Sequence, residues 1–251
     1  MHIVKLSKRE EIADGTVSFY FEKPAGFSHK AGQFLDITLI NPPETDDEGN
    51  IRPFSMASAP HEPEIMIATR IRDTAFKRVL KSAPLGTEIQ IEGPFGSFTL
   101  HNDSSRPAVF LIGGIGITPI RSIVLDVTNR KLPHKLFLFY SNRQQKDAAF
   151  FKELEELESK NDNYKFISTM TDIPAGEDLL TGSPSQVSGV EIWEGERGYI
   201  NAEMLKKHLG GLVGPIYYSA GPQAMVAAMR KTLNDAGVDD DYIRTEEFSG
   251  Y

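Results

Sequence analysis

A short run of glycines carries the clearest chemistry in the sequence. Gly113, Gly114 and Gly116 stand between the apolar run Ala108–Ile112 and a segment whose apolar residues have helical spacing. Glycine lets the backbone pass close to a ligand, and the first amides of a helix offer donors and a positive dipole end to phosphate. The run is not G-x-G-x-x-G, but its position favours a pyrophosphate site over a turn that needs glycine for steric reasons only.

The elements around this turn are expected to be a strand and a helix. Ala108–Ile112 is uniformly apolar, as in a strand buried on both faces of a parallel sheet. Thr118 is expected to cap the following helix, and Pro119 to be its first residue. Leu136–Tyr140, Tyr164–Ser168 and Ile216–Ser219 are predicted as further strands, separated by helical patterns. Residues 104–251 are therefore expected to form a doubly wound α/β domain with a parallel sheet.

The first hundred residues have a different pattern of apolar residues, typical of short strands. Four runs with strand composition are separated by proline- and glycine-containing turns: Val17–Glu22, Gln33–Ile40, Ile65–Arg72 and Glu88–Glu92. One helix is expected after Asp73-Thr74, and the acidic stretch Glu44–Asn50 is expected to be a solvated loop. Many short strands at this spacing predict an antiparallel β-barrel or sandwich over residues 1–103.

The composition removes several kinds of chemistry. The 251-residue chain has no cysteine, which excludes thiol nucleophiles and zinc or iron–sulfur clusters held by cysteine. Its six histidines include no pair spaced for one helical face, so no metal site is expected. Redox chemistry would therefore depend on an organic cofactor or on a metal without thiolate ligands.

Charge and hydropathy limit the partners. The formal net charge of −8 argues against general binding to nucleic acid or to an anionic membrane. The first residues become charged too early for a secretory leader, and the uncharged stretch 209–229 contains glycines and prolines unsuited to a membrane span. We therefore expect a cytoplasmic protein.

Taken together with four other segments, the glycine turn resembles the ferredoxin–NADP reductase superfamily. The first, Arg52-Pro53-Phe54-Ser55, is similar to the R-x-Y-S flavin motif of that family, and the others follow in family order: Ala31–Phe34, Glu92–Gly96 and the terminal portion from Ser219-Ala220-Gly221-Pro222 to Glu247-Phe248 and Tyr251. The matches span nearly the whole chain. The resemblance implies a flavin-binding barrel followed by a nicotinamide-binding α/β domain.

On the flavin side, the resemblance assigns roles to the Arg52–Ser55 motif. Arg52 would pair with the FAD pyrophosphate, Phe54 would stack on the isoalloxazine ring, and Ser55 would bond near flavin N5 as a catalytic residue. Phe54 replaces a tyrosine and so lacks its hydroxyl. Thr74 and Lys77 would contact flavin phosphate, or else form a plain helix cap beside a solvated lysine. Arg70 would reach the cofactor or line a wet barrel rim.

On the nicotinamide side, Ser141 and Arg143 follow a predicted strand where NAD-selective sites often hold a carboxylate. They favour a 2′-phosphate and hence NADPH, with NADH and a solvated loop charge left open. Thr169 to Thr171 would line the ribose pocket. Ala220, with Gly221 and Pro222, replaces the usual cysteine beside the nicotinamide ring.

The terminal segment would complete the site. The resemblance makes Glu247 and Tyr251 catalytic candidates, with Phe248 or Tyr251 covering the flavin. A frayed terminus is the alternative.

The resemblance implies an FAD-dependent NAD(P)H oxidoreductase that passes electrons to a separate carrier, such as ferredoxin, or to a small acceptor. A non-catalytic subunit of a larger redox complex and a free-flavin reductase, which would use FMN, are the alternatives. Only the resemblance favours FAD over FMN.

Overall fold

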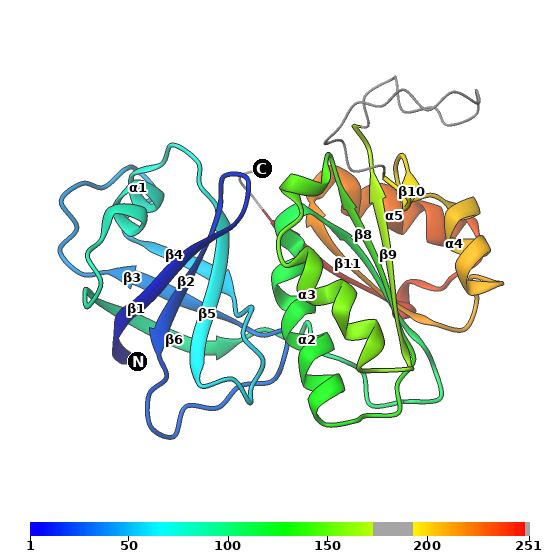
Figure 1. Ribbon diagram of the computed structural model, residues 1–251, viewed down its shortest axis with the longest axis horizontal. Coiled ribbons are helices and arrows are strands. Elements are labelled where there is room, and N and C mark those ends of the chain that lie inside the picture. Colours follow the sequence, from blue (N-terminus) through cyan, green and yellow to red (C-terminus); the bar gives the residue numbers. More distant parts are fainter. Residues whose placement is uncertain (173–192, 249–251) are drawn as a thin grey trace, which may run out of the picture.

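The computed structural model describes residues 1–172 and 193–248. Figure 1 shows two domains side by side, an antiparallel sheet with the short helix α1 and a parallel sheet covered by helices. The first domain ends with β6 (Glu88–Phe95), and the second begins with β7 (Ala108–Gly113). The division expected at residues 103 and 104 falls in the segment that connects them.

The first domain is a six-stranded antiparallel barrel-like sheet in the order β4-β3-β6-β1-β2-β5. Its other strands are β1 (His2–Ala13), β2 (Thr16–Glu22), β3 (Phe34–Leu39), β4 (Ile51–Ser55) and β5 (Glu64–Arg70). The long β1 pairs first with β6 and then, past an irregularity near Leu6, with β2. Such a bend lets one strand belong to both halves of a curved sheet. Apolar residues of these strands and of α1 (Ala75–Ser82) form one core.

The second domain has a six-stranded parallel sheet in the order β10-β9-β8-β7-β11-β12. Its other strands are β8 (Leu136–Asn142), β9 (Tyr164–Met170), β10 (Glu196–Arg197), β11 (Ile216–Pro222) and β12 (Ile243–Phe248). The helices α2 (Ile117–Asn129) and α3 (Phe151–Glu156) pack on one face, and α4 (Ala202–Leu209) and α5 (Gln223–Asp235) on the other. The predicted doubly wound α/β architecture is confirmed.

Four short 3₁₀ turns, η1 (Gly114–Gly116), η2 (Gln145–Asp147), η3 (Leu157–Ser159) and η4 (Asp240–Tyr242), complete this domain. β7 lies at the centre of the sheet, between β8 and β11, so the order of the strands reverses between β7 and β11. Ligands of open α/β sheets bind at the carboxyl ends of strands beside such a reversal.

The helix α2 lies between the parallel sheet and the barrel (Figure 1). Its first eight residues, Ile117–Val124, are all buried, because the sheet covers one side of the helix and the barrel covers another. α2 therefore fixes the first domain against the second directly behind the glycine turn. Within the described ranges, no helix is both long and apolar enough to cross a bilayer.

Candidate functional site

A cleft of about 760 Å³ lies between the domains at the carboxyl ends of β7, β8 and β11. The barrel contributes Thr16, Arg70 and Arg72 to its walls. Of the residues predicted to bind a cofactor, those lining the cleft are Arg70, Gly113, Gly114, Ser141, Arg143, Thr171 and Pro222. The sequence therefore identified much of a cleft that neither domain forms alone.

The glycines of the turn do two different things. Gly113 and Gly114 line the cleft, whereas Gly116 is buried. A Cβ on Gly116 would lie 2.4 Å from the Ala220 carbonyl oxygen, and one on Gly221 would lie 3.0 Å from the Gly113 carbonyl oxygen. Glycine therefore lets the ends of β7 and β11 pack closely, while the backbone of the first two glycines faces the cleft.

The start of α2 differs from the prediction. The turn η1 continues directly into the helix, which begins at Ile117 with Gly116 as its N-cap. The expectation that Thr118 caps the helix and that Pro119 begins it is therefore wrong, because the helix starts earlier. Thr118 is buried and its hydroxyl donates to the Ile115 carbonyl at 3.1 Å. Pro119 fits the first turn, where its missing N–H would have no helical acceptor.

Positive charge dominates the cleft. Arg70 pairs across the domains with Asp147 of η2 at 3.5 Å, and Asp147 is the acidic residue among the lining residues. Arg72 and Arg143 are exposed, and no carboxylate of the described residues lies within ion-pair distance of either. Their guanidinium groups are thus free to bind phosphate, and the Ser141 side chain lies beside them in the lining.

Thr169 lies near the end of β9 and Thr171 directly follows that strand, and of these two threonines Thr171 lines the cleft. Thr169 is buried, and its hydroxyl donates to the Gly198 carbonyl at 2.6 Å. Thr169 therefore holds the segment after β10 against β9, two residues before the position that reaches the cleft.

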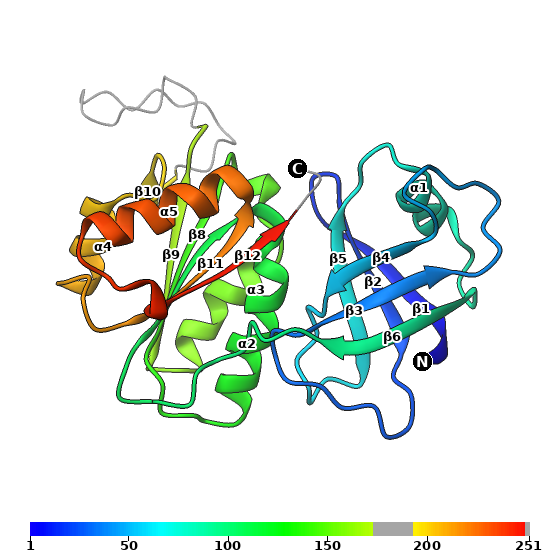
Figure 2. The same ribbon diagram turned by 180° about the vertical axis from the view of Figure 1, so that it is seen from behind.

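The strand β12 brings the chain back beside β11, with Phe248 paired to Pro222 at the cleft wall (Figure 2). Phe248 packs against the core cluster on the side of the sheet that α2 covers. Because side chains alternate along a strand, Glu246 shares this side and Glu247 points away. Glu247 is accordingly exposed. Tyr251 lies outside the described residues.

Glu246 is a site feature that the sequence did not single out. Burial raises the pKa of its carboxyl to about 7, and Oε2 is buried without a hydrogen-bond partner among the residues that the structure describes. Its strand partner is Ala220, which is buried beneath the glycine turn. Glu246 does not line the cleft itself, but it lies two residues before Phe248, whose strand partner Pro222 does. A carboxyl with a raised pKa near a cleft is typical of functional sites.

The residues predicted for the flavin side gather around β4 and α1. Arg52 bonds through Nη2 to Asp46 Oδ1 at 3.0 Å and pairs with Glu48 at 2.8 Å. Its guanidinium lies 5.4 Å from the centre of the Phe76 ring, which is 5.8 Å from that of Phe54. The half-buried Phe54 therefore presents an aromatic surface beside the arginine.

The N-terminal end of α1 is rich in cations. Thr74 caps the helix, accepting a hydrogen bond from the Lys77 amide at 3.4 Å. Burial lowers the pKa of the Lys77 ammonium, and the charges of Arg72 and Arg52 lower it further. Three cations therefore lie close enough to repel one another where the helix dipole also favours an anion. This donor set suits phosphate.

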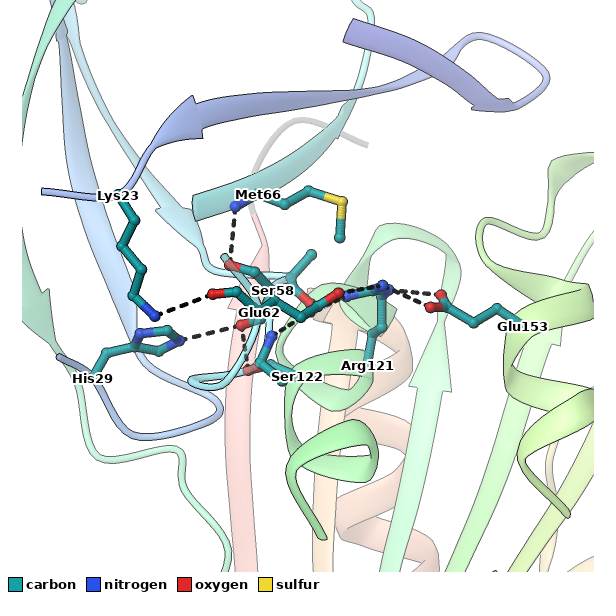
Figure 3. A network of polar contacts seen from close by, with 10 residues as sticks. Lys23, His29, Ser58, Glu62, Met66, Arg121, Ser122 and Glu153 are labelled. Carbon is teal, nitrogen blue, oxygen red and sulfur yellow. Dashed lines mark hydrogen bonds and ion pairs between the residues drawn. The ribbon is translucent and has the colours of Figure 1, made fainter. Parts of the chain in front are cut away.

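The barrel segment that follows β4 contacts α2, and we call this contact between the domains the interdomain seam. Pro53 is exposed on the edge strand β4, and Ser55, the last residue of that strand, is buried. The chain continues to Ser58, whose carbonyl accepts a hydrogen bond of 2.7 Å from Ser122 of α2 (Figure 3). The segments that follow the motif and the glycine turn are thus joined by a direct contact.

Arg121 is the centre of this seam (Figure 3). Its guanidinium donates to the Ala57 carbonyl at 2.7 Å and pairs with Glu62 of the barrel at 2.9 Å and with Glu153 of α3 at 2.6 Å. The side chain is 7% exposed. Nothing in the local sequence marks this arginine, because its partners come from segments distant along the chain.

The comparisons with known proteins agree with this arrangement. Residues 110–231 match the family model described as an oxidoreductase NAD-binding domain. The chain is 30% identical over 219 residues to one of the subunits of the Na(+)-translocating NADH-quinone reductase of Histophilus somni, and equally to the corresponding protein of Serratia proteamaculans. Each alignment covers 81% of this chain and 50% of the relative, so the chain spans about half the length of these relatives.

Solved structures share the whole two-domain fold. The flavohem-like FAD/NAD-binding domain of a nitric oxide dioxygenase from Vibrio cholerae matches with a TM-score of 0.78 at 17% identity. A ferredoxin NADP+ reductase from Neisseria gonorrhoeae, with bound FAD and NADP, matches with a TM-score of 0.76 at 19% identity. In both cases the match covers 98% of this chain and 98% of the other.

Proposed function

Because this chain belongs to the ferredoxin–NADP reductase superfamily, we propose that it is an FAD-dependent NAD(P)H oxidoreductase that passes electrons to a separate acceptor. The observation that carries the proposal is the cleft between the two domains, with the glycine turn on one side and, on the rim, Arg72 and Arg143, which have no ion-pair partner among the described residues. A ferredoxin-like protein or a small molecule would take the electrons.

The residues present suit a flavin nucleotide. Arg52, Lys77 and the first amides of α1 form a donor set for phosphate, and Phe54 offers an aromatic face beside it. The bound flavin would supply the hydride acceptor, so the task of this chain is to hold the two rings in contact and exclude water. Ser55 and Glu246 are the polar side chains we assign to the ring end of the site.

Two observations bear on the nicotinamide. Ser141 lies at the end of β8 and Arg143 directly follows the strand, with no carboxylate at the strand end, which supports NADPH. The curated relatives are named as NADH-dependent, which supports NADH. We propose NADPH as the preferred donor, because the side chains in the cleft belong to this chain itself.

A second candidate is an electron-transfer subunit of a larger redox complex. It is favoured by the curated relatives, which are subunits of a Na(+)-translocating quinone reductase. Under this proposal the chain would bind flavin and accept hydride, but would pass electrons on only to its partner.

Anaerobic titration tests these proposals. We expect the purified protein to bind added FAD and the flavin absorbance to bleach with NADPH, more weakly with NADH, followed by turnover with ferricyanide. A protein that binds FAD and bleaches but turns over ferricyanide only with a partner present would support the second candidate. A protein that binds neither FAD nor FMN would contradict both.

A further inference from the structure

One carboxylate already occupies the phosphate-binding end of α1. Asp46 accepts a hydrogen bond from the Ala75 amide through Oδ2, at 3.1 Å, and one from Arg52 through Oδ1, at 3.0 Å. Ala75 is the first residue of α1. Asp46 thus bridges a helix N-terminal amide and an arginine, which is the contact pattern of a bound phosphate.

The rest of the same segment repeats this charge pairing. We call residues 44–50 the acidic loop. Glu48 pairs with Arg52 at 2.8 Å, and Glu44 pairs with Arg78 of α1 at 2.6 Å. The loop closes on itself through the bond from the Gly49 amide to the Asp46 carbonyl at 2.9 Å. The loop is largely exposed, as the sequence predicts, but its carboxylates also pair with the cations of the flavin side.

One cation at this end of α1 still lacks an ion-pair partner among the described residues. Desolvation works to raise the pKa of Asp46, but the Ala75 amide and Arg52 outweigh it and hold that pKa below its ordinary value. Asp46 is therefore ionised at neutral pH. Lys77 has no carboxylate of the described residues within ion-pair distance, and the charges of Arg72 and Arg52 continue to act on it. An anion would relieve that repulsion.

We propose that Asp46 holds the place of a flavin phosphate, and that FAD or FMN binds by displacing its carboxylate from Arg52 and α1. This inference rests on the proposed function. One amide and one guanidinium edge cannot serve two anions, and two anions in contact repel each other. The acidic loop would therefore weaken the binding of phosphorylated flavins specifically, and make Asp46 the residue that sets flavin retention.

The substitution Asp46→Asn separates charge from structure. Asparagine keeps an acceptor for the Ala75 amide, so the end of α1 remains capped, but it gives up the ion pair with Arg52. We expect the Kd for FAD, measured by quenching of flavin fluorescence, to fall about tenfold, and the Kd for riboflavin, which has no phosphate, to stay unchanged. Glu48→Gln should shift the Kd for FAD in the same direction by a smaller factor.

Asp47→Asn is the matched control. Asp47 is exposed in the same loop, and its side chain makes no hydrogen bond or ion pair with the described residues, so its substitution removes the same charge without freeing Arg52. We expect its Kd for FAD to stay close to that of the wild type. An equal fall for Asp46→Asn and Asp47→Asn would assign the effect to net charge and overturn the proposal.

The outcomes also separate this inference from the proposed function. If wild type and Asp46→Asn bind FAD equally, or the variant binds it more weakly, Asp46 is a support for Arg52 rather than a competitor, and the inference is overturned alone. If no variant binds any flavin, the proposed function fails and the inference fails with it.

Discussion

The interdomain seam and the rim of the cleft differ in whether their charged side chains have partners. At the seam, Arg121 is almost completely buried, and a carbonyl and two carboxylates meet its guanidinium (Figure 3). At the rim, Arg72 and Arg143 are exposed with no described carboxylate in range. On the neighbouring strand β12, the half-buried Glu246 has a buried oxygen that lacks a described partner. Both regions lie between the same two domains.

The presence or absence of charge partners distinguishes residues that stabilise the fold from residues available to bind a ligand. A buried charge is tolerated in a fold when hydrogen-bond and ion-pair partners surround it, as they do for Arg121. Charged groups left without partners at a cleft are costly or idle until a ligand arrives, and they mark the place where one binds. The seam therefore holds the domains in position so that the rim can receive a cofactor.

The largest effect is expected from breaking the seam. Arg121→Met should lower the free energy of unfolding by about 3–5 kcal/mol, because it leaves two partly buried carboxylates without their cation. Urea denaturation measures the change. Lys231→Met, on α5, removes an exposed pair with Asp235 and should cost less than about 1 kcal/mol. Equal losses for both variants would mean that Arg121 does not anchor the seam.

Glu246 provides the next test, through pH. Its pKa is about 7 in the folded chain against an ordinary value of 4.5, so the folded state binds more protons between these values. Its stabilising contribution is complete below pH 4.5 and is lost as the pH rises towards 7. Relative to the wild type, Glu246→Gln should therefore gain stability across this range, reaching about 3 kcal/mol at about pH 8.

Glu247→Gln is the control for that measurement. Glu247 is exposed on the other face of β12, so its substitution should leave the pH profile of unfolding unchanged. A wild-type profile parallel to that of Glu246→Gln would show that Glu246 titrates normally and is not a buried carboxyl of the site.

The smallest effect is expected at the rim. Arg143→Ala should raise the Kd for NADPH about tenfold, or about 1.4 kcal/mol, through loss of the 2′-phosphate contact, and should change the Kd for NADH much less. Titration of the protein with each nucleotide measures both values. Lys152→Ala, an exposed cation on α3 outside the cleft, should change neither. Equal weakening of NADPH and NADH would argue against recognition of a 2′-phosphate by Arg143.

Elements with a strong local pattern could be predicted from the sequence. The uniformly apolar β7, the glycine turn and the capped helix α1 all lie where the residue pattern places them. The long strand β1 escaped prediction because Val4 and Leu6 are its only fully buried residues and charged side chains fill its exposed faces.

The contacts that complete the site could not be predicted in this way. Whether Glu246 or Glu247 faces the barrel depends on the register of β12, and a shift of one residue exchanges the two faces. The roles of Asp46 and Arg121 depend on partners distant in sequence, which local periodicity does not report. The sequence motifs predicted several residues that line the cleft, but which other side chains lie near it depends on contacts between distant segments.

The course of β12 has a practical consequence for experiments on this protein. The strand delivers the backbone to Phe248, directly beside Pro222 at the opening between the domains, whereas β1 starts on the far side of the barrel (Figure 2). A purification tag or fluorescent fusion at the carboxyl-terminal end would be attached close to a strand end that lies beside the proposed nucleotide site. Labels on the amino-terminal end leave that site clear, and assays of affinity should use them.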